Sequence, residues 1–411
     1  MANSLKWANA LSTLASLEAA VEEVATKATQ QLEAEPDLGF VFISSAFASE
    51  YSRLMPLLRS RLSNAPPLIG CSGGGIIGTD SSGESQELEG EPGLSLTLAH
   101  LPGVKVQTFA ISADRLPDLD SSPEKWVDLI GVSQAEQPQF VLLADPFSSR
   151  INDLLEGLDF AYAGSAKVGG LASGGPVPSS TGLFCNYKLH RQGTVGVALS
   201  GNIVLETIVA QGCRPIGQPY RVAAGERNVV MQLEDAVGEG SGPKSALEAL
   251  RSLIPTLSEE DRRLAQNSLF VGVVRDEFKL NLEPGDFLIR NLLGVDPNTG
   301  AIAIGDRVRA GQRIQFHLRD AKTSALDLET LVDKYQRQTQ QSDRSVGALM
   351  FSCLGRGVGL YGEANFDSSL FGRYIANVPV SGFFCSGEIG PVAGSTFLHG
   401  YTSVFGICRE P

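Results

Sequence analysis

Three glycine-rich segments contain the residues of this chain whose types and spacing could bind or transform a ligand. They are residues 70–78, 169–175 and 382–390. The first begins with GCSGG, which fits the G-x-S-x-G pattern, where a strained turn between a strand and a helix exposes a nucleophilic serine, here Ser72. The residues that follow are rich in glycine and serine, so we expect no helix there, and the sequence places no histidine to act as a base. We therefore interpret this segment as a glycine turn at a strand end.

Two segments, residues 73–78 and 357–362, also fit G-x-G-x-x-G. A dinucleotide site needs a strand before this pattern, a helix after it, and an acid about 20 residues further on. The first segment lacks the helix and the second lacks the acid, so neither predicts such a site. For the second, two interpretations stay open. Arg356 and backbone N–H groups at a helix start receive a carboxylate or phosphate, or the glycines only permit a tight connection.

Cys353, Cys385 and Glu388 stand at the ends of strand-like segments beside glycines. A thiol in such a place could line a cavity, although buried cysteine more often behaves as a small hydrophobic residue. A carboxylate in an apolar run is costly to bury alone. Glu388 therefore either binds an ammonium group of a ligand or pairs with an arginine such as Arg356.

Other polar residues follow apolar runs. Asp145 comes after FVLLA and is either a ligand-binding carboxylate at a strand's carboxyl end or a helix cap. Arg290 and Asn291 mark another strand end. The predicted ligand-binding set is Gly70, Cys71, Ser72, Gly73, Asp145, Gly169, Gly170, Arg290, Asn291, Cys353, Arg356, Cys385 and Glu388.

The elements that must position these residues follow a recurring order. An apolar strand, an amphipathic helix and a glycine turn occur from residue 40, from residue 140 and from residue 348, and a degraded fourth copy begins near residue 269. The pattern predicts an α/β fold with mixed sheets, built as two similar halves with domains at 1–204 and 205–411. We also expect an amphipathic helix over residues 5–32 and an acidic surface excursion over residues 80–92.

Composition limits the classes of function. The 411 residues are 43% hydrophobic and 19% charged, with a formal net charge of −13. This charge argues against nucleic acid or an anionic membrane as partner. No stretch of 18 apolar residues predicts a membrane span. The six cysteines form no C-x-x-C pair and the histidines stand apart, so we expect reduced thiols in the cytoplasm, with no metal and no cofactor.

With these segments assembled, the chain resembles the FIST family of sensory regions, which have an N-terminal and a C-terminal part. The matching motifs are LIGCSGGGII, DFLIRNLLGVDPNTGAIAIGDRVRAGQRIQFHLRDA, FSCLGRG and GFFCSGEIGP. The resemblance implies a module that binds a small molecule in signal transduction, with amino acids or related metabolites as ligands. The kinase, cyclase, chemoreceptor and F-box segments that accompany this family in other proteins are not recognised in this sequence.

Three functional hypotheses follow. The first is a cytoplasmic ligand-binding sensor, in which the glycine turns form the binding surface. The second is an adaptor that docks a signalling protein in trans. The third is an enzyme that uses Cys353, Cys385 or Ser72 as nucleophile, for which the sequence nominates no base.

Overall fold

The computed structural model describes residues 4–175, 177, 180–236, 242–339 and 345–411. Within them the chain divides into two compact units. The first unit extends to Ala210 and resumes at Leu328, and the second unit is Gln211–Asp327. The C-terminal segment therefore packs with the N-terminal part of the chain, whereas the sequence pattern had placed it in a separate half. The predicted α/β fold with mixed sheets is confirmed.

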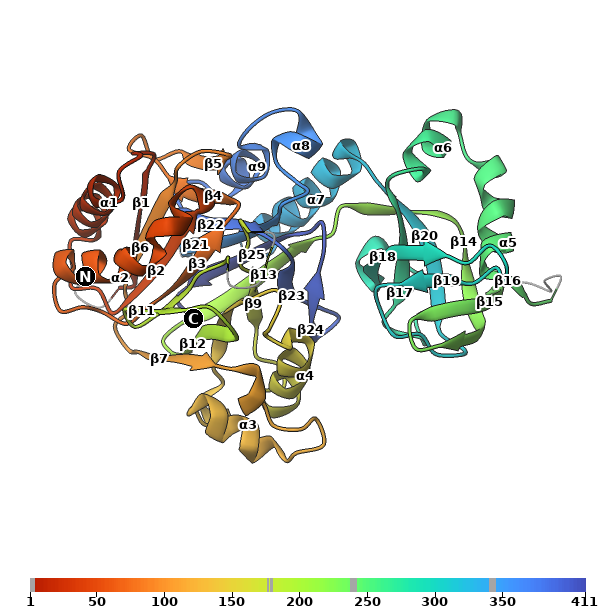
Figure 1. Ribbon diagram of the computed structural model, residues 1–411, viewed down its shortest axis with the longest axis horizontal. Helices are drawn as coiled ribbons and strands as arrows, with labels where there is room; N and C mark the ends of the chain where they lie inside the picture. The colour runs from red at the N-terminus through yellow and green to blue at the C-terminus, as the bar shows by residue number, and fades with distance from the viewer. Residues whose placement is uncertain (1–3, 176, 178–179, 237–241, 340–344) are drawn as a thin grey trace. The chain divides into compact units, whose positions relative to one another are not determined.

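The first unit contains, among its described residues, three six-stranded sheets (Figure 1). In order across sheet A lie β1 (Lys6–Ser12), β6 (Leu94–His100), β2 (Leu38–Ser44), β3 (Leu68–Gly73), β10 (Leu183–Cys185) and β11 (Lys188–His190). In order across sheet B lie β13 (Val204–Ala210), β25 (Ser403–Arg409), β21 (Ser345–Cys353), β22 (Val380–Cys385), β4 (Gly75–Thr79) and β5 (Ser85–Glu89). In order across sheet C lie β24 (Ser395–His399), β23 (Glu388–Val392), β9 (Lys167–Leu171), β8 (Gln139–Ala144), β12 (Thr194–Gly201) and β7 (Val104–Ile111).

Each sheet is built around one parallel pair of strands with a helical connection. The pairs are β2 with β3, β21 with β22 and β8 with β9. On the other side of the first strand of each pair, an antiparallel strand follows, namely β6, β25 and β12. A parallel pair needs a long crossover, and the apolar helical periodicity after each first strand supplies it. The helices of the first unit are α1 (Leu17–Leu32), α2 (Tyr51–Arg61), α3 (Pro123–Ile130), α4 (Ile151–Ala161), α8 (Val358–Tyr361) and α9 (Phe366–Tyr374), joined at the unit boundary by α7 (Ala321–Thr339).

The strand after each parallel pair leaves for another sheet. β3 continues into β4, which pairs with β22 of sheet B. β22 continues into β23, which pairs with β9 of sheet C. β9 continues into β10, which pairs with β3 of sheet A. The three sheets therefore exchange strands in a closed cycle, and the three glycine-rich segments are the crossovers.

A central apolar core lies between the sheets. The Phe383 ring of sheet B stacks on Phe42 of sheet A with centroids 5.3 Å apart, and Phe351 packs against its edge. Val141 and Leu143 of sheet C belong to the same cluster. Separate apolar clusters fix helices on each sheet: α1 and α2 on sheet A, α3 and α4 on sheet C, and α7 and α9 on sheet B. Burial of both faces explains why the strand sequences are almost continuously apolar.

Two expectations were wrong at the N-terminal third. The predicted helix over residues 5–32 is a strand, β1, followed by α1, whose N-cap Ser16 accepts a hydrogen bond from the Ala19 N–H. Trp7 and Leu11 are buried on β1, so their helical spacing was coincidental. The acidic segment 80–92 is also not merely a surface excursion, because β5 lies within it and pairs with β4.

The second unit is an antiparallel barrel. Its strands in order are β14 (Cys213–Glu226), β20 (Arg313–Arg319), β17 (Leu269–Val274), β18 (Phe287–Val295), β19 (Ile302–Ile304) and β15 (Val229–Asp235), with β16 (Lys244–Ser245) beside β15. Pairing of β14 with β15 closes the ring. Helices α5 (Ala246–Leu253) and α6 (Glu259–Ala265) accompany it. The predicted fourth copy is wrong, since β17 and β18 are antiparallel and are joined by a loop with only a 3₁₀ turn, residues 284–286.

Three glycines make the parallel pairs possible. Gly70, Gly169 and Gly382 occupy the same place in β3, β9 and β22. A methyl group on any of them would overlap the carbonyl oxygen of the residue paired with it on the neighbouring strand. This close backbone approach gives the glycines a packing role in the sheets.

We expect Gly382→Ala to lower the free energy of unfolding by about 1–3 kcal/mol, because the added methyl must displace backbone. The matched control is Gly372→Ala in α9, where a methyl would meet nothing within 4 Å. It should raise stability by about 0.5–1 kcal/mol through its helix propensity. Urea unfolding followed by circular dichroism measures both, and equal midpoints for the two variants would contradict the packing role.

Candidate functional site

The three crossovers meet in the first unit and exchange backbone hydrogen bonds. We call residues 72–75, 171–174 and 384–387 together the loop junction. The Ser173 N–H donates to the Ser72 carbonyl at 3.1 Å, and the Ser386 N–H donates to the Leu171 carbonyl at 3.1 Å. The Leu171 N–H donates in turn to the Gly387 carbonyl at 2.8 Å. Segments about 100 and 200 residues apart in the sequence are therefore held at one place.

The side chain of Ser173 links the other two crossovers to each other. Gly74, Ser173 and Ser386 each stand four residues after the closely packed glycine of their strand. The Gly74 N–H donates to the Ser173 hydroxyl at 2.8 Å, and this hydroxyl donates to the Phe384 carbonyl. The Ser72 hydroxyl adds a further link, since it donates to the Ser173 carbonyl at 3.1 Å and accepts from the Gly182 N–H at 3.0 Å. Ser72 is thus committed to buried structural hydrogen bonds.

The predicted binding residues of the loops lie mostly beneath the surface. Gly70 to Gly73 and Gly169 with Gly170 are buried in β3 and β9. The accessible part of the loop junction is further along each loop, where Gly74 is half-buried and Gly174 and Ser386 are exposed. Leu354 beside them is 48% exposed, and a methyl on Gly74 would collide with it at 2.6 Å. The ligand role of the predicted loop residues stays a prediction.

Three thiols, those of Cys71, Cys353 and Cys385, lie close together at the loop junction. Cys353 and Cys385 are in register on β21 and β22. Burial raises the pKa of Cys385 well above its ordinary value, and the charges of Glu388, Cys71 and Cys353 raise it further. Burial likewise raises the pKa of the Cys71 thiol. These shifts favour neutral thiols, which are poor nucleophiles, so the arrangement supports packing more than covalent catalysis.

Asp145 has a local role. Its carboxylate accepts from the Phe147 N–H at 3.2 Å, the Ser148 hydroxyl at 2.5 Å and the Thr181 hydroxyl at 2.9 Å. The carboxylate therefore closes the turn that follows β8 and ties it to residue 181, and α4 begins only at Ile151.

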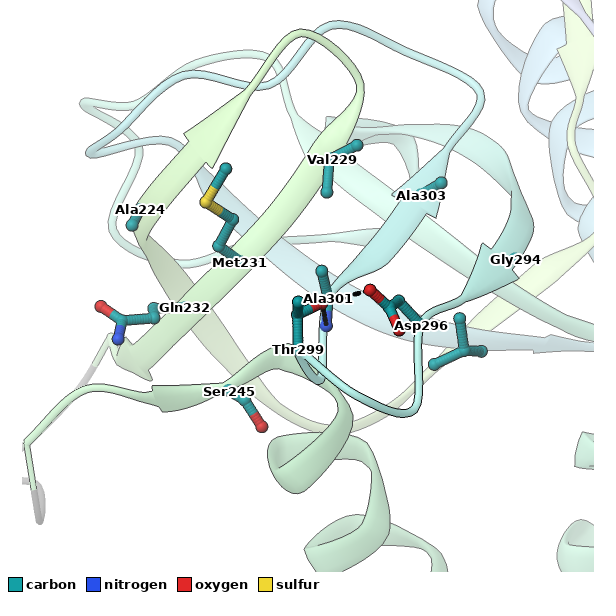
Figure 2. A pocket seen from close by; sticks show the side chains of 11 residues that line it. Ala224, Val229, Met231, Gln232, Ser245, Gly294, Asp296, Thr299, Ala301 and Ala303 are labelled. Carbon is teal, nitrogen blue, oxygen red and sulfur yellow. Dashed lines mark hydrogen bonds between the residues drawn. The ribbon is translucent and has the colours of Figure 1, made fainter.

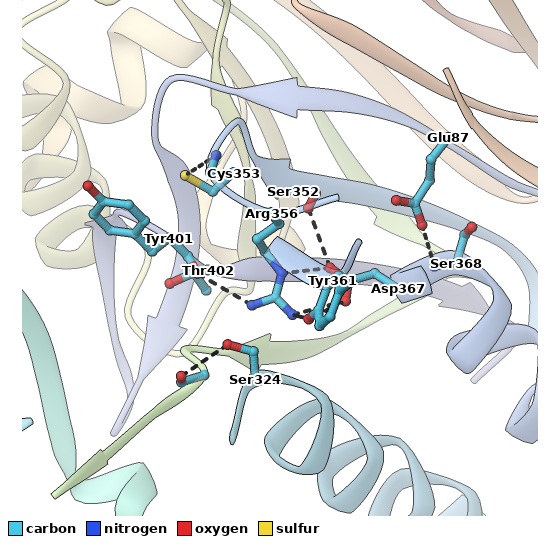
Figure 3. A network of polar contacts seen from close by, with 12 residues as sticks. Glu87, Ser324, Ser352, Cys353, Arg356, Tyr361, Asp367, Ser368, Tyr401 and Thr402 are labelled. Carbon is cyan, nitrogen blue, oxygen red and sulfur yellow. Dashed lines mark hydrogen bonds and ion pairs between the residues drawn. The ribbon is translucent and has the colours of Figure 1, made fainter. Parts of the chain in front are cut away.

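Arg356 pairs with Asp367, which sequence reasoning did not nominate (Figure 3). Both side chains are fully buried. The guanidinium Nε and Nη2 contact the two carboxylate oxygens at 2.6 and 2.9 Å, and the Tyr361 hydroxyl donates to the same carboxylate at 2.9 Å. A carboxylate oxygen of Glu388 accepts from the Thr402 N–H at 3.1 Å, and the suggested pair of Arg356 with Glu388 stays a prediction. Glu388 is in register with His399 on β24.

The anion site predicted near residue 357 is used by the protein's own carboxylates. Arg356 holds Asp367, and the Val358 N–H at the start of α8 donates to Glu89 at 2.8 Å. The interpretation of this segment as a receiver of carboxylates is consistent with both contacts. Neither contact requires a ligand.

Glu87 is a buried acidic residue that the sequence analysis did not single out. It is 4% exposed, and its carboxylate accepts from the Ser368 N–H in the first turn of α9 at 2.7 Å. Burial and, second, the charge of Asp367 raise the pKa of Glu87 to about 7. The only signal in the sequence was apolar Leu88 inside an acidic run, which could have indicated a strand there.

Arg290 and Asn291 belong to the second unit. Arg290 Nε contacts the Asp306 carboxylate at 3.1 Å, and the Asn291 carbonyl accepts from the Gly305 N–H at 2.9 Å. Both lie on β18, and their predicted role as a strand-end pair is replaced by a position in mid-strand.

Among the described residues, no group of three or more histidine, cysteine, aspartate or glutamate side chains is placed to hold a metal ion. No helix in the same residues is both long enough and apolar enough to cross a membrane.

Comparison with known proteins gives matches along most of the chain. The family model of the FIST N domain matches residues 37–236, and that of the FIST C domain matches residues 246–391. An uncharacterized protein of Mycobacterium tuberculosis is 33% identical over 394 residues, which are 96% of this chain and 97% of that protein. An F-box/LRR-repeat protein of Arabidopsis thaliana is 23% identical over 358 residues, covering 75% of this chain and 66% of that protein. A crystal structure of cyanuric acid hydrolase from A. caulinodans aligns over 98% of this chain and 99% of its own, with 8% identity and a TM-score of 0.32, which does not establish a shared fold.

Cys353 is half-buried, while the other five cysteines are buried. We expect iodoacetamide to modify Cys353 before the buried thiols and no faster than it modifies free cysteine, because its partial exposure gives access to the reagent. Peptide mass spectrometry over time measures this, with Cys353→Ser as the control that should remain unmodified in the native state. Faster modification of Cys71 or Cys385 would contradict the structural role of these thiols.

The raised pKa of Glu87 makes stability depend on pH. A carboxyl group with pKa 4.5 when unfolded and about 7 when folded stabilises the protein below pH 4.5 and loses that contribution as pH rises to 7. We expect the stability of the wild type relative to Glu87→Gln to fall by about 2–3 kcal/mol between pH 4.5 and 7.5.

Urea unfolding at a series of pH values tests this, with exposed Glu84→Gln on the preceding turn as the matched control. A flat difference between the wild type and Glu87→Gln over this range would show that folding does not raise the pKa of Glu87.

Proposed function

Because this chain belongs to the FIST family, we propose that it is a sensor that binds a small metabolite, an amino acid or a related compound, at the loop junction. FIST domains are sensory domains in signal transduction and bind small ligands. The choice of the loop junction and of the ligand class is the part that goes beyond family membership.

The observation that carries the proposal is the convergence of three crossovers on one accessible patch. A small polar ligand needs several hydrogen-bonding groups that are held rigidly at one place. The exposed backbone at Gly174 and the exposed Ser386 present such groups, and the hydrogen bonds between the crossovers fix their positions. Leu354 offers an apolar surface at the same patch.

Charged groups that the sequence nominated for the ligand have other contacts. Arg356 holds Asp367, and Asp145 accepts three hydrogen bonds from its own turn and from Thr181. The proposed contacts of an amino-acid ligand are therefore backbone N–H groups and the Ser386 hydroxyl for its carboxylate, and backbone carbonyls for its ammonium group. Such a site favours a zwitterion over a strongly charged ligand.

We place the protein in the cytoplasm, and its output in a separate signalling protein. The first part is supported by the cysteines, none of which forms a disulfide in the part of the chain that the structure describes. The second is supported by the role of FIST domains in signal transduction. The signalling partner stays a prediction.

The test is a panel of the twenty amino acids and their common derivatives, screened by thermal shift and followed by calorimetry. We expect at least one to raise the melting temperature and to bind with measurable heat. Ser386→Tyr should weaken that binding at least tenfold, since the new ring would cover the accessible part of the junction.

The matched control is Ser369→Tyr, an exposed serine on α9, which should bind as the wild type does. A panel without any ligand, or a ligand that binds Ser386→Tyr as tightly as the wild type, would contradict the proposal.

A further inference from the structure

One strand of the barrel in the second unit, β15, changes its partner along one edge. Strand β15 pairs with β19 at Val229 and Val230, then with β16 at Gln232 and Leu233. Met231 lies between these two stretches of β15, where the paired strand changes from β19 to β16. The chain between β18 and β19, residues 296–301, passes the same place, where its turn packs against the start of α5: the Leu247 N–H donates to the Gly300 carbonyl at 2.9 Å.

A hollow of about 770 Å³ opens beside this change of partner (Figure 2). Its walls come from four neighbouring strands, from the turn and from β16. The lining residues are Ala224, Val229, Met231, Gln232, Ser245, Gly294, Val295, Asp296, Thr299, Ala301 and Ala303.

The size of the side chains explains why the surface is hollow here. Ala224, Gly294 and Ala303 are the small residues of β14, β18 and β19 at this level. The larger Met231 and Val295 border them and are 40% and 42% exposed. Exposed apolar walls around a hollow of this volume are typical of a small-molecule site rather than of a barrel's outer surface.

The barrel does not need these apolar side chains for its own core. The interior cluster is formed by other residues of the same strands, among them Val222, Val230, Leu233 and Ile302. Side chains that alternate with buried ones normally meet water and are polar. Packing of the barrel core therefore does not explain why Val229, Met231 and Ala303 are apolar.

One end of the hollow carries a carboxylate. Asp296 accepts from the Asn298 N–H at 2.9 Å and from the Thr299 hydroxyl at 2.7 Å, and these two bonds fix its position in the turn. The hydrogen bonds from Thr299 and from the backbone lower its pKa, so it is ionised at neutral pH. It is the one ionised residue among those that line the hollow, and the lining contains no lysine, arginine or histidine.

We propose that this hollow binds a small organic amine, with its apolar body between Met231 and Val295 and its ammonium group at Asp296. The charge of the lining decides the class of ligand: a cation is attracted to Asp296, a neutral molecule gains only apolar contact, and an anion is repelled. The volume accommodates an aromatic or short aliphatic amine. A folded protein would need a much wider contact surface than this hollow offers. This site lies within the second unit and does not depend on the function proposed for the loop junction.

The experiment compares three probes that share a body and differ in charge: 2-phenylethylamine, 2-phenylethanol and phenylacetate. Saturation-transfer NMR and calorimetry on the full chain measure their binding. We expect the amine to bind most tightly, the alcohol more weakly, and the carboxylate least.

Three variants locate the site. Ala303→Phe fills the hollow and should weaken binding of the amine and the alcohol at least tenfold. Met231→Ala removes one wall and should weaken both by a similar factor, which keeps the test valid if Ala303→Phe fails to fold. Asp296→Asn should weaken the amine alone, by about two- to fivefold, the usual effect of an exposed ion pair.

The matched control is Glu226→Gln, an exposed acid on β14 outside the hollow, which should leave the affinity for the amine unchanged. Binding of phenylacetate as tightly as the amine would overturn the assignment of charge. An affinity for the amine that is unaltered in Met231→Ala and in a folded Ala303→Phe, or no binding of any probe, would overturn the site.

Discussion

The first unit depends on the exchange of strands between its three sheets. Each sheet includes a strand that follows directly, along the chain, from a strand of another sheet. Sheet A receives β10 after β9 of sheet C, sheet B receives β4 after β3 of sheet A, and sheet C receives β23 after β22 of sheet B. The exchange brings backbones so close that Gly70, Gly169 and Gly382 leave no room for a side chain. No sheet can reach its full hydrogen bonding without the other two, which predicts that the three fold as one cooperative body.

The polar groups of this unit fix the segment that follows β21. Burying an ion pair costs desolvation, which is offset only when the geometry is good and the remaining hydrogen bonds are made. Arg356 and Asp367 meet this condition through two direct contacts and the Tyr361 hydroxyl. Asp367 thereby contacts a guanidinium. Glu87 lies near the same carboxylate and accepts from the first turn of α9, but it forms no ion pair among the described residues, and its pKa is raised toward the neutral form. Two neighbouring acids thus acquire different roles from their surroundings.

Much of the first unit could be predicted from the sequence, because its helices carry regular apolar spacing. The helical segments after residues 44, 150 and 365 were identified by that periodicity, and the mixed sheets followed from it. The strand exchange could not be predicted, since a glycine crossover has the same sequence whichever sheet it enters. The partner of Arg356 was missed for a similar reason: Asp367 stands eleven residues away, a spacing that places two residues side by side in no regular element. Glu87 was missed because acidic neighbours conceal a single buried position.

The glycines of the crossovers divide into two kinds, and the distinction bears on function. Those inside the strands are required by backbone packing, so their presence says nothing about a ligand. Gly74 and Gly174 lie at the accessible end, where the side chains of Leu354 and Ser45 press against them from neighbouring loops. A larger residue at either place would push those loops apart. The glycine-rich pattern is therefore explained first by packing, and the case for a ligand at the junction depends on what the packing leaves accessible: the backbone at Gly174, the hydroxyl of Ser386 and the apolar side chain of Leu354.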